Sequence, residues 1–282
     1  MKPEEELVRK CYIELLKHAP NKNDLNYFLE LIESNSLDES QLINIFKNSR
    51  EYKALNAVPL DRGNLKVSQW MKRDWNVRAK VDPKMFVGLV EPNEDNFFKN
   101  GEISLQRLLS KLPIKIDAKK MRILEIGCGI GRLLIPLSDI FKEVIGVDIS
   151  EEMLRICKNN INDIKNCNVF QNNGLDLTNF EGGNFDVCLA NTVFQHIPEK
   201  NVVIEYIHEV ERVLVENGIF IFNVYSPEQA NIIKDPPNTH IGVTFSENEI
   251  IEIAKKTNFK IINAYYEDVT TYHVIFYKNK NS

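Results

Sequence analysis

The chain has 282 residues, of which 43% are hydrophobic and 27% are charged, and its formal net charge is -5. This length suits one large domain or two unequal ones with an ordinary globular composition. The lack of a basic excess argues against nucleic acid as a partner, because binding to phosphates depends on basic side chains. A charged N-terminus and the lack of a long apolar run predict a cytoplasmic protein without a membrane span. The five cysteines form no CxxC pair, so we expect neither disulfides nor a metal site.

Residues 1–58 are predicted to form a small all-α domain. Apolar residues recur there at helical spacing in three runs. Ser36 or Asp38 is placed to cap the third helix. Residues 59–66 contain a proline and a glycine and are predicted to be a linker to the remainder of the chain.

From about residue 122 the sequence alternates between apolar strands and amphipathic helices. This alternation predicts an α/β fold, with a parallel sheet covered on both faces. Ser150 and Ser246 are predicted to cap the helices that follow them. The last two predicted strands, 260–268 and 270–278, are separated by a short turn only, so they cannot be parallel neighbours. We therefore expect the sheet to end in an antiparallel hairpin.

Three glycines follow the first predicted strand in the stretch RILEIGCGIGRL. Gly127, Gly129 and Gly131 let the backbone turn sharply and approach a ligand closely. The helix N-terminus behind them favours a negative group. The second strand ends in Asp148, whose carboxylate is placed to accept hydrogen bonds from ribose hydroxyls. The ligand is therefore predicted to contain a ribose, as adenosine does.

Two cofactors fit these features. Dinucleotide sites usually show G-x-G-x-x-G, whereas the third glycine here comes one residue earlier. Glu125, two residues before the first glycine, would repel a pyrophosphate but attract an ammonium group. Ribose together with ammonium indicates S-adenosylmethionine, and a nicotinamide-dependent oxidoreductase is the less favoured alternative.

Four stretches in order resemble the successive motifs of class I S-adenosylmethionine-dependent methyltransferases, namely LEIGCGIGRL, VIGVDIS, FDVCLANTVFQHIP and VLVENGIFIFNV. The resemblance covers residues 67–282. It implies a Rossmann-like, seven-stranded, mostly parallel sheet with a reversed last strand. The cofactor-binding residues that it implies are Glu125, Gly127, Cys128, Gly129, Gly131, Asp148, Ile149, Met153, Asn191 and Phe194.

The end of the third strand departs from the family's pattern. An acidic residue usually stands there and accepts a hydrogen bond from the adenine amino group. Here Asn173 stands at that point, followed by Gly174, and both are assigned to the cofactor site. The amide oxygen of Asn173 can still accept this hydrogen bond, and Asp176 is a less favoured substitute.

Several residues are candidates for contact with the methyl acceptor. His196 follows the fourth strand and is a candidate general base, because its ordinary pKa lies near neutral pH, although a cap or a packing role is an alternative. Tyr225 ends the fifth strand, and His240 lies in a Pro-rich loop. Residues 67–115 resemble the helical lid of small-molecule members of the family, which makes Trp75 and Arg78 further candidates. The tryptophans of this segment can equally be core anchors.

Residues 8–56 resemble a short helical domain of unknown function that recurs in bacterial glycan-modifying enzymes. The resemblance implies that the acceptor is a sugar on a glycan or glycolipid, and that the helical domain docks a partner or a carbohydrate. Its matching positions are also what ordinary helix packing would produce.

We therefore predict a methyltransferase that uses S-adenosylmethionine and acts on an oxygen or nitrogen nucleophile of a small-molecule or glycan acceptor. The residues NTVF after the fourth strand differ from the Asn-Pro-Pro-aromatic signature of base-flipping enzymes, which argues against methylation of adenine in DNA. The alternative is a catalytically silent protein on the same fold that binds the cofactor or a partner.

Overall fold

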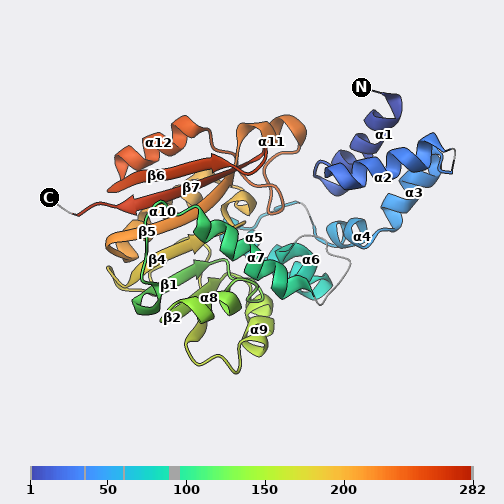
Figure 1. Cartoon of the computed structure of the whole chain (residues 1–282). Helices are drawn as coiled ribbons and strands as arrows, with labels where there is room; N and C mark the ends of the chain where they lie inside the picture. Colours follow the sequence, from blue (N-terminus) through green and yellow to red (C-terminus); the bar gives the residue numbers. More distant parts are fainter. Residues whose placement is uncertain (1, 35, 60, 89–95, 281–282) are drawn as a thin grey trace.

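The computed structural model describes residues 2–34, 36–59, 61–88 and 96–280. A seven-stranded sheet lies at its centre, with helices on both faces (Figure 1). A group of N-terminal helices lies to one side of the sheet and forms a separate lobe. The α/β class that the sequence predicted, with a preceding helical region, is confirmed.

The strands lie in the order β3-β2-β1-β4-β5-β7-β6. Strands β1 to β5 pair in parallel, whereas β7 is antiparallel to both β5 and β6. The predicted C-terminal hairpin and reversed last strand are therefore confirmed. The strands are Arg122–Ile126 (β1), Glu143–Asp148 (β2), Cys167–Gln171 (β3), Phe185–Ala190 (β4), Leu214–Tyr225 (β5), Phe259–Tyr266 (β6) and Thr271–Lys278 (β7). The order reverses between β1 and β4, and a ligand site is expected where the carboxyl ends of these strands diverge.

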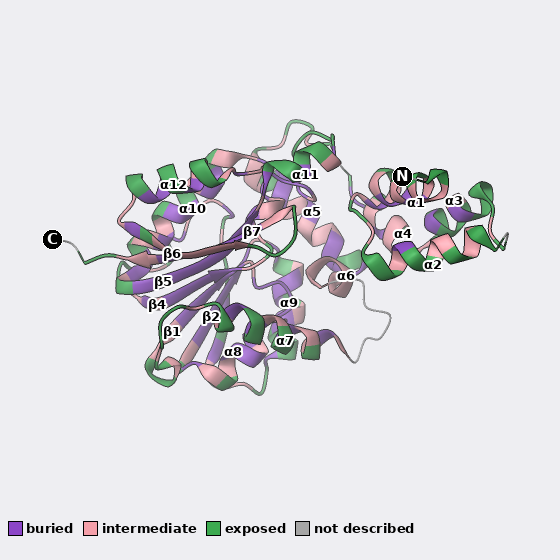
Figure 2. Cartoon of the chain, turned by 45° about the horizontal axis from the view of Figure 1, so that its top comes forward, coloured by how far each residue is buried: buried purple, intermediate pink, exposed green. Residues whose placement is uncertain are grey.

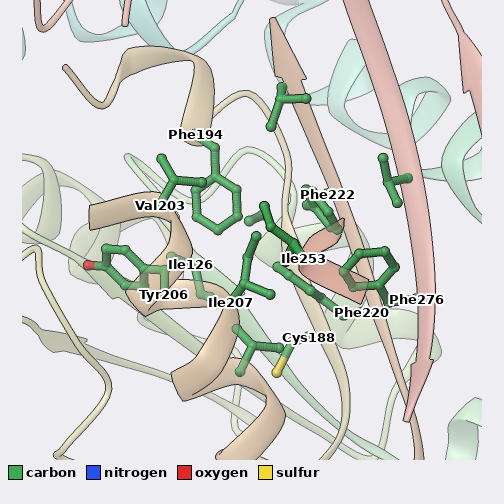
Figure 3. Packing of buried hydrophobic residues seen from close by; sticks show 14 of the residues in the cluster. Ile126, Cys188, Phe194, Val203, Tyr206, Ile207, Phe220, Phe222, Ile253 and Phe276 are labelled. Carbon is green, nitrogen blue, oxygen red and sulfur yellow. The ribbon is translucent and has the colours of Figure 1, made fainter. Parts of the chain in front are cut away.

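Each central strand supplies two hydrophobic cores, because successive side chains of a strand point to opposite faces. In β4, Cys188 belongs to one core and Leu189 to the other. Phe220 and Phe222 of β5 stack at 4.6 Å between ring centroids within the first core (Figure 3). Burial on both faces explains why these strands read as nearly continuous apolar runs.

The helices divide between the two faces of the sheet. Helices α10 and α12 cover the first core, and α7, α8 and α9 cover the second. Ser150 accepts a hydrogen bond from the Met153 amide at 3.1 Å, and Ser246 forms a capping box with Glu249, so both predicted caps are confirmed. The α-helices that follow β1 along the chain are Leu134–Ile140 (α8), Glu151–Asn160 (α9), Lys200–Val213 (α10), Pro227–Ile232 (α11) and Glu247–Lys256 (α12).

The N-terminal lobe has a small core of its own, visible as buried segments among exposed ones (Figure 2). Tyr12 packs edge-on against Phe46, with 4.9 Å between the ring centroids. Asp38 forms the capping box of the third helix, and Ser49 caps a further short helix that the periodicity did not resolve. The elements are Pro3–Cys11 (α1), a π-helical turn at Tyr12–Leu16, Lys22–Glu33 (α2), Glu39–Asn48 (α3) and Arg50–Asn56 (α4).

Three helices connect this lobe to the sheet, namely Val67–Val81 (α5), Pro83–Val87 (α6) and Asn96–Ser110 (α7). Gly101 of α7 lets that helix approach the turn after β1, because a Cβ there would overlap the carbonyl oxygen of Arg132. Asp82 caps α6 and also forms an ion pair with Arg50 of the N-terminal lobe. A second ion pair joins Lys17 to Asp235 at 2.9 Å.

Among the described residues, no helix is both long enough and apolar enough to cross a lipid bilayer.

The separate core of the N-terminal lobe makes a prediction about stability. Leu42 has 0% exposure, whereas Ile45 on the same helix is 44% exposed. We expect Leu42→Ala to destabilise the lobe by about 2–5 kcal/mol and Ile45→Ala to cost less than about 0.5 kcal/mol. Thermal unfolding followed by circular dichroism should show a lowered first transition in Leu42→Ala. Binding of S-adenosylhomocysteine should be unchanged, and its loss would show that the lobe and the sheet unfold as one unit.

Candidate active site

The glycine turn after β1 is fastened to the end of β2. The amides of Gly127 and Cys128 both donate to the carbonyl oxygen of Val147, at 2.7 and 3.0 Å. Gly127 and Gly129 have φ of 68° and 54°, a region that favours glycine. The turn thereby runs along the carboxyl edge of the sheet, at the point where β1 and β4 diverge.

Asp148 is placed beside this turn by the end of β2. Its Oδ2 accepts from the Gly129 amide at 2.9 Å, and its Oδ1 accepts from the Ser150 amide at 2.8 Å. Burial raises the pKa of Asp148 to about 6, although these backbone hydrogen bonds lower it in part. Each carboxylate oxygen can accept a further hydrogen bond, and ribose hydroxyls would favour the ionised form.

A cavity with an empty volume of about 830 Å³, including its mouth, lies over the turn. Val87 of α6 leans over the turn, because a Cβ on Gly129 would lie 2.9 Å from Cγ2 of Val87. Of the residues assigned from the sequence, those that line the cavity are Trp75, Glu125, Gly127, Cys128, Gly129, Asp148, Ile149, Met153, Gly174, Asn191 and His196.

Glu125 supplies the acidic group at the floor of this cavity. It is 4% exposed, and its Oε2 has no hydrogen-bond partner. Burial raises the pKa of Glu125 well above its ordinary value, while the nearby charge of Arg132 lowers it. An unpaired buried carboxyl oxygen fits the ammonium group of S-adenosylmethionine, which would supply the missing donor.

Asn173, the residue assigned to the adenine contact, does not line this cavity, whereas the preceding residue does. Asn173 is exposed, and its Oδ1 accepts from the amides of Leu175 and Asp176 in a local turn. Asn172 lines the cavity, and its Oδ1 is buried without a partner. Its amide nitrogen donates to the hydroxyl of Tyr206 at 2.8 Å. Among the described residues, the oxygen of Asn172 is thus an unpaired hydrogen-bond acceptor on a residue that lines the cavity.

Other assigned residues lie outside the cavity lining. Phe194 has 0% exposure and packs in the first core, beside Phe222 in Figure 3, because its short 3-10 helix turns inward over β5. Gly131 has φ of 91° and serves the turn alone. The hydroxyl of Tyr225 accepts from Gln195 at 3.2 Å. His240 lies behind His196 and stacks on it at 6.1 Å between ring centroids.

His196 is fixed in one tautomer by the backbone. Its Nδ1 lies 2.6 Å from the carbonyl oxygen of His240, and a carbonyl can only accept, so Nδ1 carries the proton. Nε2 is then the acceptor nitrogen and has no hydrogen-bond partner among the described residues. Burial, together with the charge of Arg78, lowers the pKa of His196 to about 4, although the hydrogen bond to His240 raises it in part. The ring is therefore neutral at physiological pH.

The helices before the sheet contribute one wall of the cavity. Trp75 of α5 and Phe86 and Val87 of α6 line the same space as the glycine turn. The ring of Trp75 meets His196 edge-on at 5.4 Å between centroids. The expectation for residues 67–115 anticipated this arrangement, although the sequence singled out neither Phe86 nor Val87. Residues 89–95 of this segment lie outside the described residues.

A family profile described as a methyltransferase domain matches residues 117–272, which is more than half of the chain. The chain therefore belongs to the methyltransferase domain family. The match does not include residues 1–58, so the resemblance noted for them stays a prediction.

Relatives match over about half of the chain. YqeM of Bacillus subtilis is 28% identical over 153 residues, which are 51% of this chain and 62% of YqeM. The rRNA N(6)-adenosine-methyltransferase metl-5 of Caenorhabditis elegans is 23% identical over 157 residues, covering 50% of this chain and 73% of that protein. The chain thus spans less than two thirds of the length of YqeM.

Among solved structures, magnesium protoporphyrin IX methyltransferase (ChlM) from Synechocystis PCC 6803, with bound S-adenosylmethionine, matches with a TM-score of 0.57. It is 15% identical and covers 78% of this chain and 100% of that chain. At this identity the likeness concerns the fold, and it agrees with the predicted Rossmann-like architecture. The cofactor expected from the sequence is the one that this neighbour holds.

The buried carboxyl group of Glu125 makes a prediction about proton linkage. Burial raises the pKa of this group in the free protein, and an arriving ammonium group should lower it, so binding should release protons from Glu125. Calorimetry with S-adenosylhomocysteine at neutral pH, in two buffers of different ionisation enthalpy, should show net proton release. Glu125→Gln should abolish the release, and the exposed control Glu216→Gln should not. Release that persists in Glu125→Gln would place the titrating group elsewhere.

Proposed function

We propose that this protein is an S-adenosylmethionine-dependent methyltransferase that acts on an oxygen or nitrogen nucleophile of a small-molecule acceptor, with a glycan or glycolipid sugar included in that class. The observation that carries the proposal is the shared cavity. Its floor holds Glu125, the glycine turn and Asp148, and its other wall holds His196 and the helices before the sheet. One enclosed space thus offers hydrogen-bond acceptors for the cofactor and a neutral base for the methyl acceptor.

Enclosure by α5 and α6 favours a small acceptor over a macromolecule. Trp75, Phe86 and Val87 bring apolar surface over the glycine turn. A segment that covers the reacting atoms excludes water and orients the two reactants. A large folded acceptor would require this cover to move aside. An enclosed apolar wall is also typical of sites that take small molecules.

The residues around the cavity have distinct chemical roles in this proposal. S-adenosylmethionine supplies an electrophilic methyl group on its sulfonium when it is bound. Glu125 and Asp148 orient the amino acid and ribose ends of the cofactor. Nε2 of His196 accepts the proton of a hydroxyl or amine nucleophile as the new bond to carbon forms. Its neutral state at physiological pH keeps the lone pair available.

The glycan part of the proposal comes from the N-terminal lobe. Its resemblance to helical domains in glycan-modifying enzymes supports a sugar acceptor and a docking partner. The lobe contacts the remainder of the chain through the Arg50–Asp82 and Lys17–Asp235 ion pairs. Asp82 also caps α6, so the lobe adjoins the helix that covers the cavity.

Cofactor binding is tested first by calorimetric titration with S-adenosylhomocysteine, with NADH as a control ligand. We expect micromolar affinity, and Asp148→Ala should weaken it by about tenfold or more, or about 1.4 kcal/mol, because the ribose loses its acceptor. The exposed control Asp163→Ala should bind as the unmodified protein does. Tighter binding of NADH, or no binding of S-adenosylhomocysteine, would contradict the proposal.

The role of His196 is tested once a screen of hydroxyl and amine acceptors has found methyl transfer. His196→Ala should lower kcat by about a hundredfold, the usual size of a general-base effect. Because its pKa is about 4, His196 stays neutral as the pH falls from 8 to 5, so kcat should not decline near pH 6.5. A decline at pH 6.5 that disappears in His196→Ala would mean that the ring is not desolvated as described.

A further inference from the structure

Arg78 of α5 is among the largest fully buried side chains of the protein, with 1% exposure. Its Nη2 donates to Oγ1 of Thr239 at 3.0 Å. Its Nε and Nη1 have no hydrogen-bond partner in the part of the chain that the structure describes. A buried guanidinium with two unused donors is costly, because the lost hydration of the charge is not replaced.

Among the described residues, no carboxylate forms an ion pair with Arg78. The nearest acidic neighbour, Asp74, is already committed, since its Oδ1 accepts from Arg73 at 2.7 Å and its Oδ2 accepts from the Thr239 hydroxyl at 2.5 Å. The nearby charge of Asp74 raises the pKa of Arg78, but burial is the larger effect and lowers it to about 10. The cluster therefore retains a cation that its own acidic group does not neutralise.

The guanidinium lies behind the wall of the proposed active site, and Arg78 itself is not among the residues that line the cavity. Its Cζ is 4.7 Å from the ring centroid of Trp75 and 5.5 Å from that of Phe86, and both rings line the cavity. Its charge also lowers the pKa of the two stacked histidines, His196 and His240. Arg78 is thus close to the candidate base rather than to the acidic floor.

The opposite end of the cavity has a cation of its own. Arg132 lines the cavity, and its charge lowers the pKa of Glu125. A carboxylate on the amino acid end of the cofactor, held near Glu125, has Arg132 as its nearby partner. Arg78, whose guanidinium lies against Trp75 and Phe86, remains for the other reactant.

Resting on the proposed methyltransferase function, we propose that Arg78 binds an anionic group of the methyl acceptor, a carboxylate or a phosphate, at the end of the cavity bounded by Trp75, Phe86 and His196. Such a group accepts hydrogen bonds from the two unused donors and neutralises the buried charge. A neutral analogue of the acceptor leaves the donors unpaired and is selected against. Neutralisation of Arg78 also removes one cause of the lowered pKa of His196, so the base strengthens when the acceptor binds.

The test compares matched probes on the full chain saturated with S-adenosylhomocysteine. Benzoate, phenyl phosphate and the neutral benzamide are titrated by ligand-observed NMR. We expect at least one anion to bind about tenfold more tightly than benzamide, the value of a charge-assisted hydrogen bond. The tighter of the two anions identifies the group as a carboxylate or a phosphate.

Arg78→Met should remove the preference for the anion by about tenfold while binding of benzamide and S-adenosylhomocysteine stays unchanged. Arg78→Lys, which keeps the charge, should retain part of the preference. Arg155→Met, at an exposed ion pair on α9, is the matched control and should behave as the unmodified protein does. Arg78→Met should melt no lower than the unmodified protein, because the Thr239 hydroxyl keeps its bond to Asp74 and an unpaired buried charge is removed.

Three results would overturn this inference. Equal binding of benzamide and both anions to the unmodified protein would show that no anion subsite exists. An anion preference that survives in Arg78→Met would assign it to another cation. A tenfold loss of S-adenosylhomocysteine affinity in Arg78→Met would assign Arg78 to the cofactor instead. The titrations are repeated without S-adenosylhomocysteine, so that a failure of cofactor binding, which would overturn the proposed function, leaves the anion measurement readable.

Discussion

Two hydrogen bonds to one carbonyl group position most of the candidate site. The amides of Gly127 and Cys128 both donate to Val147, which joins the turn after β1 to the end of β2. Because β1 and β2 are parallel neighbours, their carboxyl ends meet at one edge of the sheet. Asp148 follows Val147 directly, so the same bonds set the distance between its carboxylate and the glycine turn. The Asp148 bond to the Ser150 amide then fixes where α9 begins.

The other half of the site comes from elements outside the sheet. Helix α5 and the segment after β5 meet at the Asp74–Thr239–Arg78 cluster, where one hydroxyl accepts from the guanidinium and donates to the carboxylate. The same segment supplies the carbonyl of His240 that orients His196. The wall opposite the glycine turn is therefore held by polar contacts, whereas the floor is held by the hydrophobic cores beneath the sheet.

Local patterns in the sequence predicted most of the fold and the floor of the site. The caps at Ser150 and Ser246, the glycine turn and Asp148 are each encoded within a few neighbouring residues. The sequence placed the adenine contact after β3 on Asn173, whereas Asn172 is the residue that lines the cavity. The two side chains are chemically identical, so the sequence alone could not tell which of them faces the site. The partners of Arg78 were beyond prediction, since Thr239 lies 161 residues further along the chain. The sequence assigned Phe194 to the cavity wall. Its inward position could not be read from the sequence, because it depends on packing over β5.

The bond between Asn172 and Tyr206 leaves one end of the Asn172 amide for a ligand. The amide nitrogen is committed to the Tyr206 hydroxyl, so only the oxygen remains unpaired at the cavity. That oxygen accepts and cannot donate. A purine with an amino group at its sixth position satisfies it, whereas a purine with a carbonyl there sets two lone pairs against each other. The end of the Asn172 amide that is turned toward the cavity would thus bear on the choice between adenine and hypoxanthine.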